Sequence, residues 1–319
     1  MKNFKISLII ISAVFWVSCE QVLDPSDFED EFGDYQPELK IEGLLQQDQP
    51  EDSIIRIIKT ITITDTEVEN GVDDDGDGEI DEEDEILPLI QDTSATVKVT
   101  CLNSSEVIDF HYVEDADSIV RRDPDGEVIT IPYGAYKPVS GDFLLEQYAQ
   151  YQIDIYSRDF DQTITGVTTV YPPVVFTDPL FNTYGDRITM TVNEQKEILW
   201  MSDGEVTAYF LTYEEITEEG GEFLGSFSRA ADPDLSQPHP NVSVGREILY
   251  GLGSEMTLKL TEEAFSPKWG RYIFSELPLK DPQRTNLRDQ NGDPVMGCFG
   301  ASSATSILVL VENNERDTP

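Results

Sequence analysis

Short runs of β-branched and aromatic residues recur along nearly the whole chain, and this pattern constrains the fold most. Residues 151–156 (Tyr-Gln-Ile-Asp-Ile-Tyr) alternate between apolar and polar, as a strand with one buried face does. Seven such runs occupy residues 38–45, 54–64, 95–102, 107–113, 128–131, 149–158 and 163–170. Seven short strands over about 130 residues predict an immunoglobulin-like β-sandwich.

A second set of runs follows residues 171–173 (Tyr-Pro-Pro), which mark the best candidate for a domain boundary. The runs are 187–192, 197–201, 207–214, 222–229, 256–260, 270–276 and 306–312. Helical turns are expected at 143–148 and 261–266, and a long loop at 230–245. The chain is therefore predicted to be all-β, with a sandwich at 38–171 and a second β-rich domain at 174–312.

The first 18 residues have the pattern of a secretion signal. Lys2 and Lys5 precede a short apolar core at residues 6–17, which is well under the roughly 18–20 residues needed to span a membrane. A small residue followed by Cys19 resembles a lipoprotein signal-peptidase site. We expect residues 1–18 to be removed and Cys19 to carry the lipid. An ordinary signal peptide with an incidental cysteine is the alternative.

The residues after Cys19 are strongly acidic. Residues 20–38 carry eight acids and no Lys or Arg. We interpret 19–37 as a flexible tether between a lipid anchor and the folded chain. Its acidity also resembles the surface-export signals of Bacteroidota lipoproteins, although a plain solvated linker would have the same composition.

Residues 65–86 form an acidic insertion that contains a calcium-loop pattern. Residues 73–84 read Asp-Asp-Asp-Gly-Asp-Gly-Glu-Ile-Asp-Glu-Glu-Asp, with glycine at the sixth position, where such loops turn sharply. The predicted Ca²⁺ ligands are the side chains of Asp73, Asp75, Asp77, Asp81 and Asp84 and the main-chain carbonyl of Glu79. Asp84 is one methylene shorter than the usual Glu.

The surroundings of this pattern are not those of a helix-loop-helix sensor. β-branched residues precede it and Leu87-Pro88 follows, so a loop between strands is expected. Residues 65–85 hold thirteen acids and no Lys or Arg. A solvated acidic loop that binds nothing is the alternative.

The composition excludes several functions. Sixty-three acidic residues against 21 basic ones give a net charge of −42, which is incompatible with a nucleic-acid partner. The sequence has no nucleophile elbow, phosphate-binding glycine loop or dinucleotide fingerprint. Only His111 and His239 are available as imidazole bases. The chain is therefore not expected to be an enzyme.

Two kinds of side chain allow more than one interpretation. Cys101 and Cys298 either form a disulfide, which an oxidising compartment would permit, or are separate small apolar residues in the core. Several aromatic residues either stack on a sugar or peptide or belong to the core, which is the commoner case at strand spacing. They are Trp200, Tyr209, Tyr213, Trp269 and Tyr272.

Four short motifs occur in order and together resemble a known family. They are Cys19-Glu-Gln-Val-Leu-Asp, Leu39-Lys-Ile-Glu-Gly43, Thr168-Thr-Val-Tyr-Pro-Pro173 and a late motif, Asn286-Leu followed by Gly292-Asp-Pro-Val-Met-Gly-Cys-Phe-Gly-Ala-Ser-Ser303. This order resembles the Bacteroidota lipoprotein family known as domain of unknown function 4249 (DUF4249). In this chain, Cys298 stands where that family usually has Tyr, and Gly300 where it has Ser.

The resemblance implies an outer-membrane lipoprotein, held by its lipid on the periplasmic or cell-surface face. Members are often encoded beside TonB-dependent transporters, so a non-enzymatic accessory of such a transporter or of a surface complex is the leading expectation. The acidic insertion is not implied by the family. The alternatives are a carbohydrate or peptide hydrolase that uses an unrecognised carboxylate pair, and a calcium-stiffened structural or adhesion module.

Overall fold

The computed structural model describes residues 37–60, 91–122, 128–139, 143–177, 187–203, 206, 208–217, 220–230, 242–250 and 255–312. Leu39–Thr60 and Leu89–Pro319 belong to one compact unit. All of the fold described below lies within that unit.

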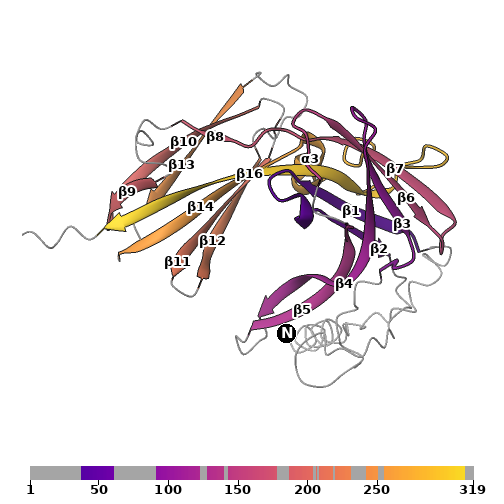
Figure 1. Cartoon of the computed structure of the whole chain (residues 1–319), viewed down its shortest axis with the longest axis horizontal. Helices are drawn as coiled ribbons and strands as arrows, with labels where there is room; N and C mark the ends of the chain where they lie inside the picture. The colour runs from indigo at the N-terminus through magenta and orange to yellow at the C-terminus, as the bar shows by residue number, and fades with distance from the viewer. Residues whose placement is uncertain are drawn as a thin grey trace, which may run out of the picture. The chain divides into compact units, whose positions relative to one another are not determined.

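Strands make up nearly all of the regular structure, which confirms the all-β prediction (Figure 1). The first half contains β1 (Leu39–Gln46), β2 (Ile54–Lys59), β3 (Thr96–Cys101), β4 (Val107–Arg122), β5 (Val128–Pro138), β6 (Gln150–Ser157) and β7 (Gln162–Thr169), with the short 3-10 helix η2 (Pro50–Asp52). The second half contains β8 (Val175–Phe176), β9 (Arg187–Thr191), β10 (Gln195–Asp203), β11 (Ala208–Thr217), β12 (Gly220–Ala230), β13 (Val242–Tyr250), β14 (Met256–Phe265), α3 (Pro267–Phe274), β15 (Leu287–Asp289) and β16 (Met296–Glu312).

Most strands belong to one mixed sheet of 13 strands. Its order is β12-β11-β14-β16-β1-β2-β5-β4-β3-β6-β7-β15, and β9 also pairs with β16. The pairings are antiparallel except that β16 runs parallel to β1 and to β9. A separate three-stranded sheet has the order β13-β10-β8.

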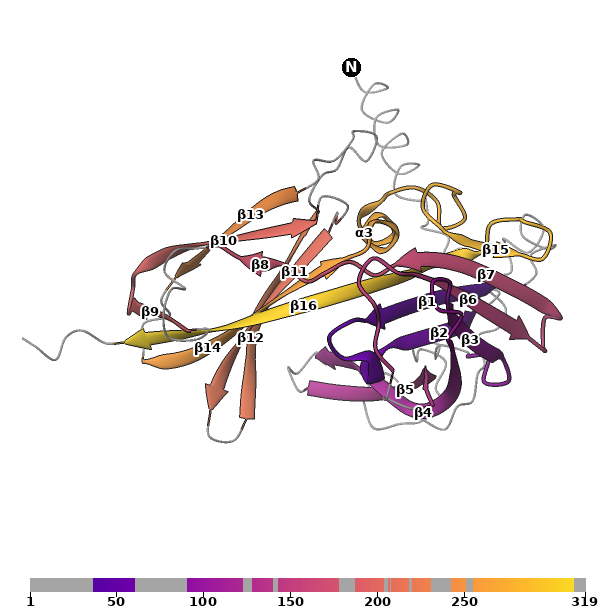
Figure 2. The same ribbon diagram turned by 45° about the horizontal axis from the view of Figure 1, so that its top comes forward.

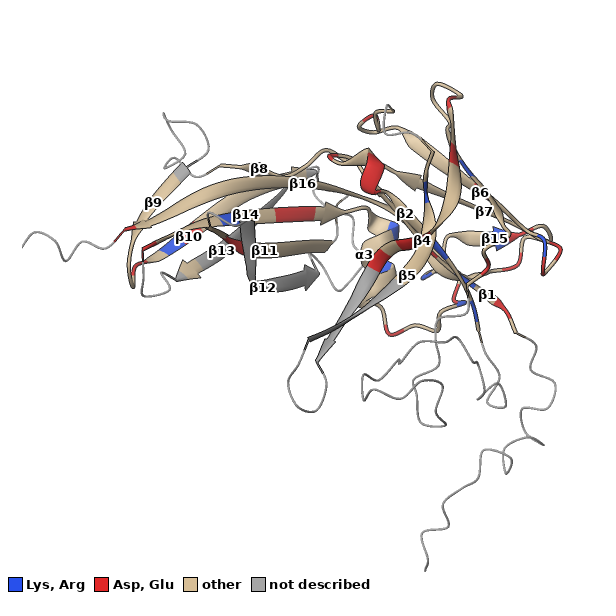
Figure 3. Ribbon diagram, turned by 60° about the horizontal axis from the view of Figure 1, so that its bottom comes forward, with Lys and Arg blue, Asp and Glu red and all other residues tan. Residues whose placement is uncertain are grey.

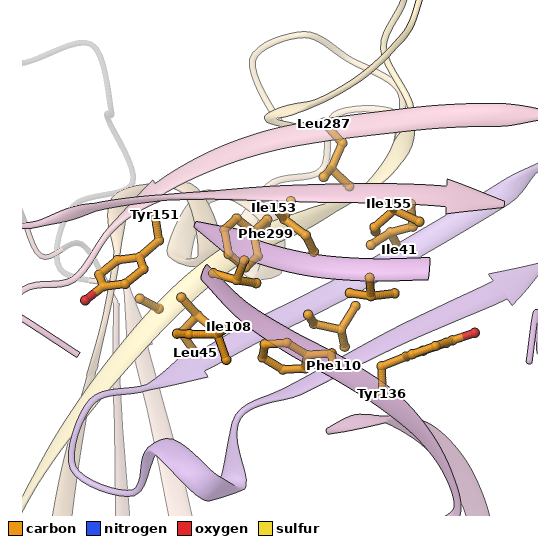
Figure 4. Packing of buried hydrophobic residues seen from close by; sticks show 14 of the residues in the cluster. Ile41, Leu45, Ile108, Phe110, Tyr136, Tyr151, Ile153, Ile155, Leu287 and Phe299 are labelled. Carbon is orange, nitrogen blue, oxygen red and sulfur yellow. The ribbon is translucent and has the colours of Figure 1, made fainter. Parts of the chain in front are cut away.

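The first core forms because apolar residues alternate along the strands that surround it. On β1, Leu39, Ile41, Gly43 and Leu45 are buried, while the residues that alternate with them are more exposed. Figure 2 shows β6 and β7 in one layer and β1 and β2 in another. Side chains from both layers point toward one another and meet Phe299 of β16 (Figure 4). The predicted sandwich is therefore built from one continuous sheet that folds over its core.

The last strand joins two hydrophobic clusters. Phe299 and Ala301, early in β16, pack in the first core, whereas Ile307, Val309 and Val311 pack in a second cluster with residues of β9, β10, β11, β13 and β14. The two predicted domains therefore share β16. The predicted boundary at 171–173 lies between β7 and β8, and the division into two domains stays a prediction.

Two local predictions in the second half are wrong. Residues 270–276 were expected to form a strand because they are aromatic and β-branched, but Pro267–Phe274 is helix α3. Pro267 occupies the first turn, where its missing N–H costs nothing. Residues 261–266 were expected to be helical, yet 261–265 complete β14. Thr261 pairs with Thr212 on one side and with Ser306 on the other, and these ladders override local propensity.

The prediction of a helical turn at residues 143–148 is also wrong. Residues 143–146 have no regular structure, and a non-helical turn follows. Phe143 and Leu145 are buried in the first core, while Leu144 between them is 81% exposed. This alternation fits an extended segment that covers the core and does not fit a helical turn.

Candidate functional site

The residues predicted to carry function lie mostly outside the described part of the chain. Cys19 and the six calcium ligands, Asp73, Asp75, Asp77, Glu79, Asp81 and Asp84, are all outside it, as is most of the predicted loop at 230–245. Residues 242–245 of that loop belong to β13. The described residues nevertheless include the segments on either side of residues 61–90, which contain the acidic insertion, and the whole of the late motif.

The segments on either side of residues 61–90 are paired with each other. Ile58 near the end of β2 and Gln91 before β3 form an antiparallel bridge. The main-chain N–H of Asp92 donates to the Ile57 carbonyl at 2.9 Å. Residues 61–90 therefore leave and re-enter the sheet at neighbouring positions, as an insertion between adjacent backbone segments does.

Asp92 fixes the returning end of this insertion. It is only 1% exposed, and its carboxylate accepts hydrogen bonds from the Ser94 N–H at 2.9 Å, the Ser94 hydroxyl at 3.0 Å and the Ser157 hydroxyl. The Tyr136 hydroxyl donates to the Asp92 carbonyl at 2.8 Å. Because the hydrogen bonds of this buried carboxylate are satisfied, Asp92 holds the backbone in place where the chain returns to the sheet after residue 90.

Asn286 holds two edges of the folded sheet together. Its side-chain N–H groups donate to the Val167 carbonyl on β7 at 2.8 Å and to the Phe299 carbonyl on β16 at 2.7 Å. Its Oδ1 accepts from the Phe299 N–H at 2.9 Å and from the Cys298 thiol at 3.4 Å. The first residue of the late motif therefore has a structural role, because its side chain links β7 to β16 by hydrogen bonds.

Two glycines of the late motif are required for close packing. Gly297 has φ +102°, and a Cβ there would lie 1.8 Å from the Ile41 carbonyl oxygen on β1. A Cβ at Gly300 would lie 2.5 Å from Cβ of Trp269 on α3. These positions admit only glycine, because β1 approaches one and α3 covers the other. The late motif thus has a packing role.

A network of charged side chains connects α3 to the outer face of β1 and β2. Glu42 accepts a hydrogen bond from the Tyr272 hydroxyl of α3 at 2.7 Å and pairs with Lys40 at 2.8 Å and Arg56 at 3.8 Å. Burial raises the pKa of Glu42, but the hydrogen bonds from Lys40 and Tyr272 and the charges of Lys40 and Arg56 outweigh it, so the net pKa lies below its usual range.

Arg56 extends this network to the β4–β5 hairpin. Its guanidinium lies 3.3 Å from the Asp117 carboxylate and 4.2 Å above the centre of the Tyr133 ring. The Tyr133 hydroxyl donates to the same carboxylate at 2.5 Å. Each charge is neutralised by a partner, so the network acts as a structural connection between elements. The sequence carries one signal of this network, the alternation of Lys40 and Glu42 on β1.

One pair of acidic residues consists of Asp48, in the bend after β1, and Glu263 on β14. Asp48 accepts a hydrogen bond from the Ala304 N–H at 3.2 Å, and Glu263 is the register partner of Ala304. Burial raises the pKa of Glu263, and the Asp48 charge adds to this. No group of three or more metal-ligating side chains occurs among the described residues.

The remaining chemically reactive side chains are separated or buried. Cys101 and Cys298 are both buried and both free, so they are core residues and not a disulfide. Among the five aromatic residues considered above, Trp200, Tyr209 and Tyr272 are buried, which favours the core interpretation for them. In the described part of the chain, no helix has the length and hydropathy of a membrane span.

The chain matches no protein-family model and no curated protein. A solved structure with some similarity contains the three N-terminal domains of the bacteriophage RB49 highly immunogenic outer capsid protein (Hoc). The identity is 8%, the match covers 88% of this chain and 71% of that one, and the TM-score is 0.25. So low a score supports no statement about fold or function, and the fold is described from the chain's own strands and contacts.

Proposed function

We propose that this protein is a lipid-anchored, calcium-binding protein of the outer membrane that works by binding and not by catalysis. The observation that carries the calcium part is the pairing of Ile58 with Gln91 at the ends of residues 61–90. A loop with calcium spacing joins neighbouring points on a rigid sheet, so it is free to bind a cation without rearranging the core.

The anchoring part rests on the sequence of the N-terminus. A short apolar core followed by Ser18-Cys19 is the pattern of a lipidation site, and the acidic residues 20–38 would place the folded sheet away from the bilayer. The motif resemblance to DUF4249 supports the same location. It also makes a TonB-dependent transporter or a surface complex the proposed partner.

The binding role is favoured over hydrolysis by the arrangement of the described side chains. The charge of Glu42 is neutralised by Lys40 and Arg56. His111 lies on β4 and is not part of this network. Asp48 and Glu263 are the carboxylate pair to test for the hydrolase alternative.

Co-purification tests the proposal most directly. The native protein is extracted in mild detergent with and without calcium, and associated proteins are identified by mass spectrometry. A transporter that co-purifies supports the proposal. Turnover of a glycan or peptide that disappears in Asp48→Asn or Glu263→Gln, and not in the exposed control Glu106→Gln, would replace it with the hydrolase.

A further inference from the structure

Two carboxylates from different parts of the chain approach the same short stretch of β16. Asp48, in the bend after β1, accepts a hydrogen bond from the Ala304 N–H at 3.2 Å. Ala304 is also the register partner of Glu263 on β14. Figure 3 shows the acidic part of β14 in red, toward the end of the strand. Ala304 therefore lies between the two acidic residues.

The pairing of Ala304 with Glu263 brings the Glu263 side chain close to β16. Because the Ala304 N–H is donated to Asp48, it does not point toward β14. Ala304 and Glu263 are thus a non-hydrogen-bonded pair, the kind in which the side chains of an antiparallel ladder lie closest, with Cβ atoms about 4.5–5.5 Å apart. Burial raises the pKa of Glu263, and the charge of Asp48 raises it further, as expected for two carboxylates at short range.

The hydroxyl of Ser302 is a third oxygen on this face of the sheet. Ser302 is the register partner of Phe265, two residues after Glu263, so the Ser302 and Glu263 side chains point to the same face. Ser302 is 3% exposed, and its Oγ has no hydrogen-bond partner in the described part of the chain. The Gln47 N–H donates to the Ser302 carbonyl at 2.9 Å, which holds Ser302 beside the bend that carries Asp48. A buried hydroxyl without a protein partner usually binds an ordered water or an ion.

Glu263 has an apolar neighbour on the side away from β16. Phe210 of β11 is its register partner there, and the Phe210 ring contacts the Phe265 ring edge to face, with centroids 5.5 Å apart. Asp48, by contrast, is exposed. The three oxygen-bearing side chains are therefore open to solvent at Asp48 and flanked by aromatic rings at Glu263. A cation beside Glu263 is attracted more strongly than it would be in open water.

We propose that Asp48, Glu263 and Ser302 form a binding site for a magnesium ion. Carboxylate and hydroxyl oxygens are hard ligands, which suit magnesium and calcium and do not suit soft metals. Two carboxylates and one hydroxyl are too few for the roughly six to eight oxygen ligands of calcium. Magnesium keeps several of its waters and is commonly held by one or two carboxylates, and the exposed position of Asp48 leaves room for those waters. This site rests on neither the calcium loop nor the lipid anchor.

Calorimetry with Mg²⁺ tests the site in the full-length mature protein that carries Asp75→Ala, so that the predicted calcium loop does not contribute. We expect weak binding that falls about tenfold or more in Asp48→Asn and in Glu263→Gln, a loss of roughly 1.4 kcal/mol. Ser302→Ala should weaken it several-fold. The matched control is Glu51→Gln, which removes an exposed charge from the nearby η2 and should keep full binding. Absence of binding, or an equal loss in Glu51→Gln, would overturn the proposal.

Carboxyl labelling gives a readout that does not depend on the folding of a variant. In the wild type, a water-soluble carbodiimide couples an amine to accessible carboxylates, and mass spectrometry measures the extent at each residue. Mg²⁺ should protect Asp48 at least several-fold and leave Glu51, an exposed acid close by in the chain, unchanged. Equal labelling of Asp48 with and without Mg²⁺ contradicts the site.

Competition with calcium identifies the metal and separates this site from the proposed calcium loop. In the Asp75→Ala protein, Ca²⁺ should displace Mg²⁺ only weakly, because the site has too few ligands for calcium. Tighter binding of Ca²⁺ than of Mg²⁺ that is lost in Glu263→Gln would overturn the assignment to magnesium. Magnesium heat that is present in the wild type and absent in Asp75→Ala would place the ion in the loop and reject this site. Either failure leaves the calcium and anchoring proposals untouched.

Discussion

Asn286 is the single side chain whose loss should weaken the first core most. It makes four hydrogen bonds that join β7 to β16. Asn286→Ala leaves partly buried main-chain groups without partners, and we expect the free energy of unfolding to fall by about 2–4 kcal/mol. The control Asn291→Ala removes a side chain from an exposed turn and should cost under about 1 kcal/mol in the same urea titration.

Two glycines in one motif should differ sharply in their tolerance of alanine. Gly297 and Gly292 both have positive φ, +102° and +86°, but only at Gly297 would the added Cβ overlap a neighbour, the Ile41 carbonyl. Gly292→Ala should cost about 1 kcal/mol through backbone strain alone. Gly297→Ala should cost more than about 3 kcal/mol or prevent folding. If thermal unfolding shows that the two variants lose similar amounts of stability, the close approach of β1 to β16 is not the reason that glycine is required at position 297.

Glu263 should make stability depend on pH. Burial and the neighbouring Asp48 raise its pKa above 4.5 in the folded chain. The folded state then holds the proton more tightly than the unfolded state, so this contribution is lost as pH rises through the raised pKa. Relative to the wild type, Glu263→Gln should gain stability as the pH rises above about 4, the usual pKa of a free Glu. The exposed control Glu106→Gln should differ from the wild type by the same free energy of unfolding at every pH. The same pH-independent difference for Glu263→Gln would contradict the burial of the Glu263 carboxylate.

At the scale of elements, the acidic insertion should behave as a separable part. The segments on either side of residues 61–90 are joined by the Ile58–Gln91 bridge and by the hydrogen bond from the Asp92 N–H to the Ile57 carbonyl. Asp75→Ala should abolish calcium heat in calorimetry, where the wild type should bind at about 10⁻⁴–10⁻³ M. The free energy of unfolding without calcium should change by under about 0.5 kcal/mol.

The matched control for this experiment is Glu106→Ala, which removes an exposed acid from the β3–β4 turn. It should leave calcium binding intact. Absence of calcium heat in the wild type at millimolar concentration would reject the calcium loop. Unfolding of Asp75→Ala without calcium would instead show that the insertion is part of the core.

At the scale of the whole molecule, the lipid should provide the membrane attachment. The net charge of −42 repels an anionic bilayer, so electrostatics cannot replace the anchor over the surface as a whole. Cys19→Ala should move the protein from the membrane fraction to the soluble fraction or block its processing. Fractionation and immunoblotting measure this, and a Cys19→Ala protein that stays quantitatively with membranes contradicts the lipidation site.

The sequence by itself determined the strand-rich class and most strand positions, because alternation of apolar and polar residues follows directly from the two faces of a strand. It also predicted that Cys101 and Cys298 could be buried, unpaired residues. It failed at α3, where Trp269, Tyr272 and their neighbours have strand-like composition. It failed at residues 261–265, where pairing with β11 and β16 decides the conformation.

Only the tertiary structure decided which distant residues meet. Asn286 contacts Val167 across 119 positions, and Tyr272 contacts Glu42 across 230. Local periodicity carries no information about contacts at such separations, because it records which face of an element is apolar and not which element covers that face. The sharing of β16 between two hydrophobic clusters and the hydrogen bond of Asn286 to β7 both arise from this long-range pairing, which the fold alone provides.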